Sequence, residues 1–203
     1  MNRSSRFVFK IALAGMFTAV AVVGSMLQFP VFGSQCAPVQ HMVNVLCAVA
    51  VVGSMLQFPV FGSQCAPVQH MVNVICAVFL GPGYGVAVAF LASLLRNLFH
   101  LGSLLAFPGS MCGALLCGLM YWKTKNLPAT LCAEVFGTGI IGGLLSYPIA
   151  IAFMGVVAGS IAFYAYVVPF LISTVAGSIL AGALVFALKR SGALKTMQTV
   201  LEH

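Results

Sequence analysis

Three hydrogen-bonding side chains fall within five positions of an otherwise apolar stretch: Gln69, His70 and Asn73. Gln69 and Asn73 are four residues apart and His70 and Asn73 are three apart, so all three share one face of a helix. A heterocyclic ligand needs a few placed polar groups in an apolar cleft. We therefore expect these side chains to form the polar floor of a small-molecule site. Hydrogen bonding between membrane helices is an equally open role for them.

The chain offers little for metal or covalent chemistry. No carboxylate or second histidine lies at ligand spacing from His70, so we expect no metal site. The seven cysteines form no CxxC pair and no Cys/His zinc spacing. Only two carboxylates exist, Glu134 and Glu202, which excludes paired-carboxylate catalysis. P-loop and nucleophile-elbow motifs are missing as well, so we expect neither an enzyme nor a cofactor.

Further candidates would lie near the outer mouth of the same cleft. Arg96 is one, because an arginine within a membrane is costly and usually functional; snorkelling to the outer surface is the alternative. Phe58 and Phe61 flank Pro59 in a loop that could close over an apolar ligand or simply carry interfacial aromatics. The remaining candidates for substrate contact are Asn97, Phe107 and Tyr147.

Glu134 is an uncertain candidate. At 1.5 Å per residue it would lie about 7 Å from the inner end of its span, whereas Arg96 would lie about 18 Å from the inner end of its own. We therefore expect no direct pair between Arg96 and Glu134. The carboxylate is expected instead to pair with an inner lysine or to contact a partner.

The elements that position these residues must be membrane-spanning helices. Apolar residues make up 62% of the chain and charged residues 5%, with a mean hydropathy of +1.12. No charged residue lies between Lys10 and Arg96, and apolar runs of this length predict transmembrane helices. The composition thus predicts an all-α integral membrane bundle in a single domain, 1–203. Six spans are expected, at 11–27, 68–82, 84–100, 107–122, 129–150 and 164–188. A turn signal at 80–83 ends the second of them, and residues 106–110, up to Ser110, open the fourth. Small residues such as Gly109 and Gly113 are expected to let the helices of the bundle pack closely.

The net charge of +7 comes from basic residues that set the orientation of the spans in the membrane, and it does not indicate nucleic-acid binding. Basic residues cluster at the ends of the apolar runs, and such clusters favour the cytoplasmic side. Six spans place all three clusters inside, so both termini are expected in the cytoplasm. The clusters are Arg3, Arg6 and Lys10; Lys123 and Lys125; and Lys189, Arg190 and Lys195.

A 29-residue block is present twice in tandem, at 21–49 and 50–78, and differs only at Leu46 against Ile75. The junction creates a hybrid segment, 39–56, which is about long enough to cross the membrane. A seventh span would put the termini on opposite sides. Three interpretations stay open: an inverted N-terminus, a hybrid segment that lies along the bundle, or an artefact of the sequence.

We favour a functional unit built from the second copy onward, because this copy runs directly into the next predicted span. The residues of the first copy that correspond to the polar floor are expected to be displaced. They are Gln40, His41 and Asn44.

Four stretches resemble one known family in order along the chain. They read FPVFGSQCAPVQHMVN (58–73), FLGPGYGVAVAFLASLLRN (79–97), LLAFPGSMCGALLCGLMYWKTK (104–125) and EVFGTGIIGGLLSYPIA (134–150). Together they are similar to the thiazole-type S components of energy-coupling factor (ECF) transporters, the ThiW family. The family pattern has one copy of the block.

The resemblance implies a six-span subunit that binds hydroxyethylthiazole, a thiamine precursor, from outside. It also implies partners: a transmembrane coupling subunit and two ATPases. The coupling contact would involve the small residues Gly15 and Ala19 on the first span. The alternatives are a membrane scaffold without a transport role and an S component for another vitamin precursor.

Overall fold

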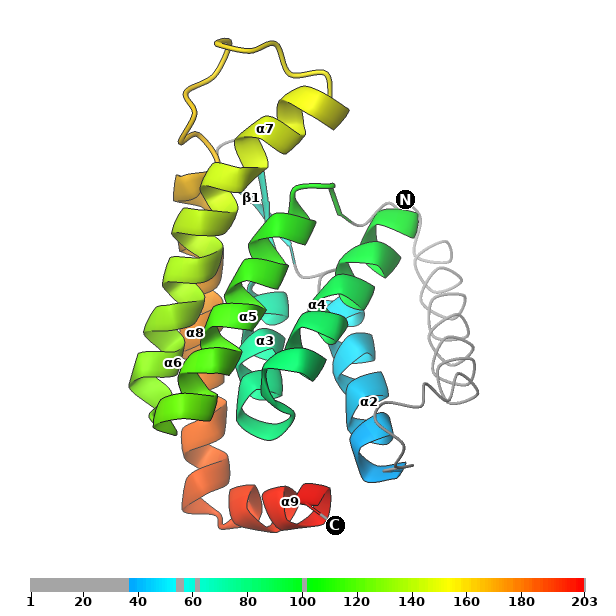
Figure 1. Cartoon of the computed structure of the whole chain (residues 1–203), viewed down its shortest axis with the longest axis vertical. Coiled ribbons are helices and arrows are strands. Elements are labelled where there is room, and N and C mark those ends of the chain that lie inside the picture. Colours follow the sequence, from blue (N-terminus) through cyan, green and yellow to red (C-terminus); the bar gives the residue numbers. More distant parts are fainter. Residues whose placement is uncertain (1–36, 54–56, 61–62, 100–101, 203) are drawn as a thin grey trace, which may run out of the picture.

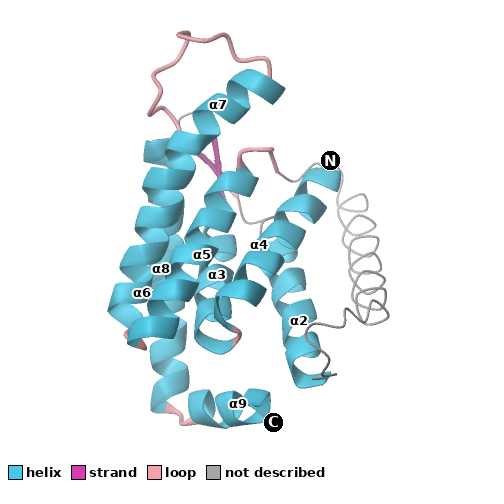
Figure 2. Ribbon diagram, in the orientation of Figure 1, coloured by secondary structure: helices cyan, strands magenta, loops and turns pink. Residues whose placement is uncertain are grey.

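The computed structural model describes residues 37–53, 57–60, 63–99 and 102–202. Within them the chain is helical apart from one short hairpin and the connecting loops, the longest of which joins α7 to α8, and the long helices run alongside one another (Figure 1; Figure 2). The helices are α2 (Ala37–Gly53), α3 (Pro67–Phe79), α4 (Gly81–Leu98), α5 (Ala106–Thr124), α6 (Leu127–Glu134), the π-helix η1 (Val135–Gly142), α7 (Gly143–Phe153), α8 (Val167–Arg190) and α9 (Ala193–Glu202).

Among the described residues, two elements are long and apolar enough to cross a membrane, by length and composition. One is the continuous rod Leu127–Phe153 of α6, η1 and α7, with 27 residues, and the other is α8, with 24. They cover the spans expected at 129–150 and 164–188. The spans expected at 84–100 and 107–122 correspond to the helices α4 and α5.

The predicted turn at 80–83 is confirmed. Helix α3 ends at Phe79 and α4 begins at Gly81, so the span expected at 68–82 is a shorter helix. Gly81 has a φ of +80°, a conformation that glycine adopts without steric cost. The short turn makes α3 and α4 antiparallel neighbours.

The predicted packing of helices through small residues is confirmed inside the bundle. A Cβ on Gly137 would lie 2.9 Å from the carbonyl oxygen of Cys112, and a Cβ on Gly109 would lie 2.7 Å from the Phe170 ring. Such close approach is what glycine permits between membrane helices. The glycines therefore hold η1 against α5, and α5 against α8.

The hybrid segment forms the helix α2, which lies along the bundle at its edge (Figure 1). It packs on α3 and α4. One apolar core joins Leu46 and Cys47 of the first copy to Ile75 and Cys76 of the second. The span predicted at 11–27, with Gly15 and Ala19, lies outside the described residues.

A hairpin precedes α3, where a non-helical loop was predicted. Strand β1 (Phe58–Val60) pairs antiparallel with β2 (Ser63–Cys65), with Phe58 opposite Cys65. Phe61 lies outside the described residues. At the opposite end of the molecule α9 crosses beneath the bundle (Figure 1), and Gln198 Nε2 donates to the carbonyl oxygen of Val78 at 3.3 Å.

Candidate functional site

The three polar residues of α3 lie in the middle of the bundle, with Gln69 2%, His70 8% and Asn73 1% exposed. Helix α3 packs against α2, α4, α5, α6 and α8, so its polar face meets other helices on several sides. Buried polar groups of this kind require hydrogen-bond partners. The neighbouring helices supply them in two connected groups.

The first group surrounds Gln69. Arg96 Nη1 on α4 donates to Gln69 Oε1. Gln69 Nε2 in turn donates to Ser93 Oγ at 3.0 Å and to Ser110 Oγ at 2.7 Å. Arg96 is 4% exposed, so it lies inside the protein rather than snorkelling. The group thus joins three helices, α3, α4 and α5.

The second group surrounds Glu134, and here the sequence-based expectation was wrong. The carboxylate does not pair with an inner lysine; it is 0% exposed, and its Oε1 accepts from Asn73 Nδ2 at 3.0 Å and from Thr138 Oγ1 at 3.0 Å. His70 Nδ1 lies 3.2 Å from the same oxygen. Counting residues from the inner end of the span placed Glu134 near the inner surface, but this count does not say which helix lies opposite. The tightly packed rod of α6 and η1 brings Glu134 to the face of α3.

Gly113 provides the space for this carboxylate. A Cβ at this position would lie 2.6 Å from Glu134 Oε2 and 2.8 Å from Oε1, and it would also overlap the Thr138 hydroxyl. Any larger residue on α5 would therefore displace the acid. The glycine thus has a second role besides helix packing.

Arg96 and Glu134 do not contact each other directly, as expected, but the adjacent residues of α3 connect them. The guanidinium bonds to Gln69, and the carboxylate lies against His70 and Asn73. Burying a single charge in a low-dielectric interior is costly, whereas two opposite charges offset each other. The polar centre is therefore close to neutral when His70 is uncharged.

Three atoms of the network have no hydrogen-bond partner among the described residues: Arg96 Nε, Asn73 Oδ1 and Glu134 Oε2. A buried donor or acceptor without a partner is unfavourable. Since the Arg96 side chain lines the cavity described next, its free N–H is a group that a bound molecule could satisfy.

A cavity of about 40 Å³ adjoins the first group. Its walls combine polar side chains with one aromatic ring. They are formed by Ala66, Gln69, His70, Arg96, Ser103, Ala106, Gly109, Ser110, Phe170 and Ser173. The base of the hairpin is tied to α8 beside it, because Ala66 N donates to Ser173 Oγ at 2.9 Å and Cys65 Sγ to the carbonyl of Pro169 at 3.2 Å.

Five predicted site residues among those described do not line this cavity. Asn73 instead donates to the backbone carbonyl of Ser110 and to Glu134 Oε1. Asn97 Nδ2 donates to the backbone carbonyls of Ser93 and Ser103, and so holds the turn between α4 and α5. Phe107 packs on Phe90 at a centroid distance of 5.6 Å. The Tyr147 hydroxyl accepts from the backbone N–H of Gly159, and Phe58 is 41% exposed on the hairpin.

The sequence reasoning missed Ser93, Ser110, Phe170 and Ser173. Ser93 lies three residues before Arg96 and shares its helix face, a spacing that would have pointed to it. Ser110 was noted only as part of a span start. Phe170 and Ser173 gave no local signal, since only the packing of α8 on α3 brings them to the cavity. In the described part of the chain, no three metal-ligating side chains gather.

Comparison with protein families gives one match. The family described as thiamine-precursor transporter protein (ThiW) matches residues 11–52 and again residues 47–191. The two matches overlap within α2, where the hybrid helix passes from the first copy to the second. No curated protein and no solved structure matches the chain.

Proposed function

Because the chain belongs to the ThiW family of thiamine-precursor transporters, a membrane protein family with small-molecule substrates, we propose a specific role within it. The chain acts as the substrate-binding S component of an ECF transporter, and its ligand is hydroxyethylthiazole. The observation that carries this proposal is the cavity in which Arg96, Gln69 and His70 converge beside Phe170. An enclosure that combines fixed polar groups with an aromatic ring suits a small heterocycle that carries a hydroxyl group.

The proposed ligand satisfies one of the atoms without a partner, Arg96 Nε. When the proton of the neutral imidazole is on Nδ1, facing Glu134, His70 Nε2 is an acceptor. The ligand hydroxyl donates to this nitrogen and accepts from Arg96 Nε, while the thiazole ring packs on Phe170. Glu134 then acts as a positioning residue, because it fixes the orientation of His70 and Asn73 without touching the ligand.

The cavity of about 40 Å³ is too small for a whole heterocycle, because each water molecule requires about 10–15 Å³ by this measure. We propose that the structure represents a closed form. Opening would move the hairpin and the ring of Phe170 outward and break the two hydrogen bonds that tie Cys65 and Ala66 to α8, which would make room for the ligand. Movement of a loop over a bound ligand is a common way to exclude water.

For the membrane topology we propose that α2 takes the position of the first span. The second family match begins at residue 47, inside α2, and continues through the bundle, which supports a functional unit built from the second copy onward. Both termini of this unit face the cytoplasm. A transmembrane coupling subunit and two ATPases would supply the energy, and Gly15 and Ala19 stay candidates for the coupling contact.

The proposal is tested by titrating the purified protein, in lipid nanodiscs, with hydroxyethylthiazole and with the same thiazole carrying an ethyl group. We expect saturable binding of the alcohol and at least tenfold weaker binding of the ethyl analogue, because the latter leaves buried polar groups unpaired. The pyrimidine precursor of thiamine is the comparison ligand for the alternative specificity. Absence of saturable binding for every thiamine precursor would contradict the proposal, and would favour a scaffold role.

A further inference from the structure

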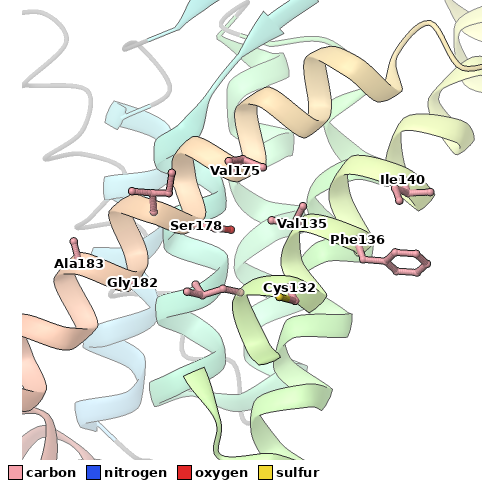
Figure 3. A pocket seen from close by; sticks show the side chains of 10 residues that line it. Cys132, Val135, Phe136, Ile140, Val175, Ser178, Gly182 and Ala183 are labelled. Carbon is pink, nitrogen blue, oxygen red and sulfur yellow. The ribbon is translucent and has the colours of Figure 1, made fainter. Parts of the chain in front are cut away.

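An apolar groove of about 600 Å³ runs between the α6–η1 rod and α8, apart from the polar centre. Figure 3 shows Phe136 and Ile140 on one wall and Val175, Gly182 and Ala183 on the other. Both walls belong to the two elements that are long and apolar enough to cross a membrane. The groove therefore opens toward the hydrocarbon of the bilayer.

The dimensions of the groove match one lipid leaflet. Its wall on the rod extends from Leu131 to Ile140, about 13 Å along a helix, which is close to half of a hydrocarbon core of about 30 Å. A Cβ at Gly182 would lie 3.2 Å from Leu131 Cδ1. The absence of a side chain at Gly182 therefore leaves room beside Leu131 at the lower end of the groove.

Basic residues lie below this lower end. Lys189 and Arg190 end α8, and Lys123 ends α5 just before α6 begins; all three are exposed. Lys189 follows Gly182 by seven residues, or about 10 Å on a helix, and its long side chain can extend to the headgroup region. Among the described residues, no carboxylate forms a salt bridge with these cations.

We propose that this groove binds one acyl chain of an anionic phospholipid, whose phosphate is held by Lys189, Arg190 and Lys123. The charge complementarity selects the headgroup, since clustered basic residues at the cytoplasmic ends of spans attract anionic lipids. The apolar lining selects an acyl chain rather than a polar ligand. The site is independent of the ligand cavity, so its test does not depend on thiazole binding.

The test uses the delipidated full-length protein and native mass spectrometry with phosphatidylglycerol and phosphatidylcholine of identical acyl chains. We expect phosphatidylglycerol to be retained about tenfold more tightly. The double variant Lys189→Gln, Arg190→Gln should bring the two lipids close to parity. Ala183→Phe, which fills the groove from an exposed position, should weaken both lipids, whereas the control Ala187→Phe, one turn further along α8, should match the unmodified protein.

Two outcomes would overturn the proposal. Equal retention of the two lipids by the unmodified protein would show that the basic residues do not select an anionic headgroup, and unchanged retention of both lipids by Ala183→Phe would show that no acyl chain lies in the groove. A membrane helix of another subunit is the competing occupant. It would give full lipid retention in Ala183→Phe together with loss of the co-purified coupling subunit. Ser178→Ala adds a second readout. The buried hydroxyl lacks a partner among the described residues, and the hydrocarbon of an acyl chain offers it no acceptor, whereas a protein helix could; lipid retention should therefore be unchanged. Thermal unfolding of each variant confirms that it is folded.

Discussion

The two copies of the repeated block place one sequence in two environments. In α3, from the second copy, Val74 is 0% exposed and Val78 is 5% exposed. Their equivalents in α2, Val45 and Val49, are 59% and 38% exposed. Both copies form helices, so the difference comes from their neighbours: α3 is surrounded by α2, α4, α5, α6 and α8, whereas α2 packs mainly on α3, α4 and α9.

The comparison teaches that a polar pattern becomes a site only where other helices complete it. Asn73 is 1% exposed and bonds to Glu134, while the equivalent Asn44 is half-buried on the edge helix. The serines, the arginine and the glutamate of the network all come from elements that surround α3. Repeating the α3 sequence does not repeat those elements, so the chain has a single polar centre in its described part.

The sharpest test of this difference makes the same substitution in each copy separately. Asn73→Ala should weaken hydroxyethylthiazole binding at least tenfold, because it removes two buried hydrogen bonds, one to the carbonyl of Ser110 and one to Glu134. Asn44→Ala should change the dissociation constant by less than about twofold, as is usual for peripheral positions. Isothermal titration calorimetry in nanodiscs measures both. Equal losses in the two variants would mean that both copies contribute to the site.

A second test displaces Glu134, the acid that His70 and Asn73 both contact. Without this partner the second copy resembles the first. Gly113→Ala should push Glu134 away from His70 and Asn73, since its Cβ has no room beside the carboxylate. We expect about tenfold weaker ligand binding and a loss of stability of about 2 kcal/mol from overpacking. Gly85→Ala is the matched control, because a Cβ there meets its nearest atoms at 3.7 Å. A Gly113→Ala variant that binds normally would show that the carboxylate is not needed for positioning.

A third test compares packing without touching polar groups. Val74→Ala should lower the free energy of unfolding by about 1.5–2 kcal/mol, because two buried methyl groups are lost. Val45→Ala, at the equivalent exposed position, should stay within about 0.5 kcal/mol. Thermal or denaturant unfolding in detergent gives the two values. Similar losses would place α2 at an interface as tight as that of α3.

The smallest effect is expected from removing a whole copy. Deleting 21–49 leaves one intact block and joins Val20 to Ala50, which regenerates an uninterrupted apolar helix in place of α2. Ligand affinity should change by less than about twofold, because every residue of the cavity lies after the deletion. Loss of binding in this variant would assign the first copy an essential role in the bundle.

Periodicity and composition predicted most of the fold. Apolar runs located α4, α5, the α6–η1–α7 rod and α8, and Gly81 marked the turn between α3 and α4. The spacing of Gln69, His70 and Asn73 predicted a buried polar face. The position of Glu134 was missed, because counting residues along one helix gives depth but not the neighbour across the bundle. Phe170 and Ser173 were missed for the same reason.

The sequence by itself determined the class of the protein, its helices and the polar face of α3, because apolar runs and helical spacing are local properties. Tertiary structure alone decided which copy of the repeat is surrounded, that Arg96 and Glu134 balance each other through α3, and that Gly113 makes room for the acid. These depend on contacts between residues far apart in the chain. Two nearly identical stretches of sequence can therefore both form helices and yet differ in whether they build a site.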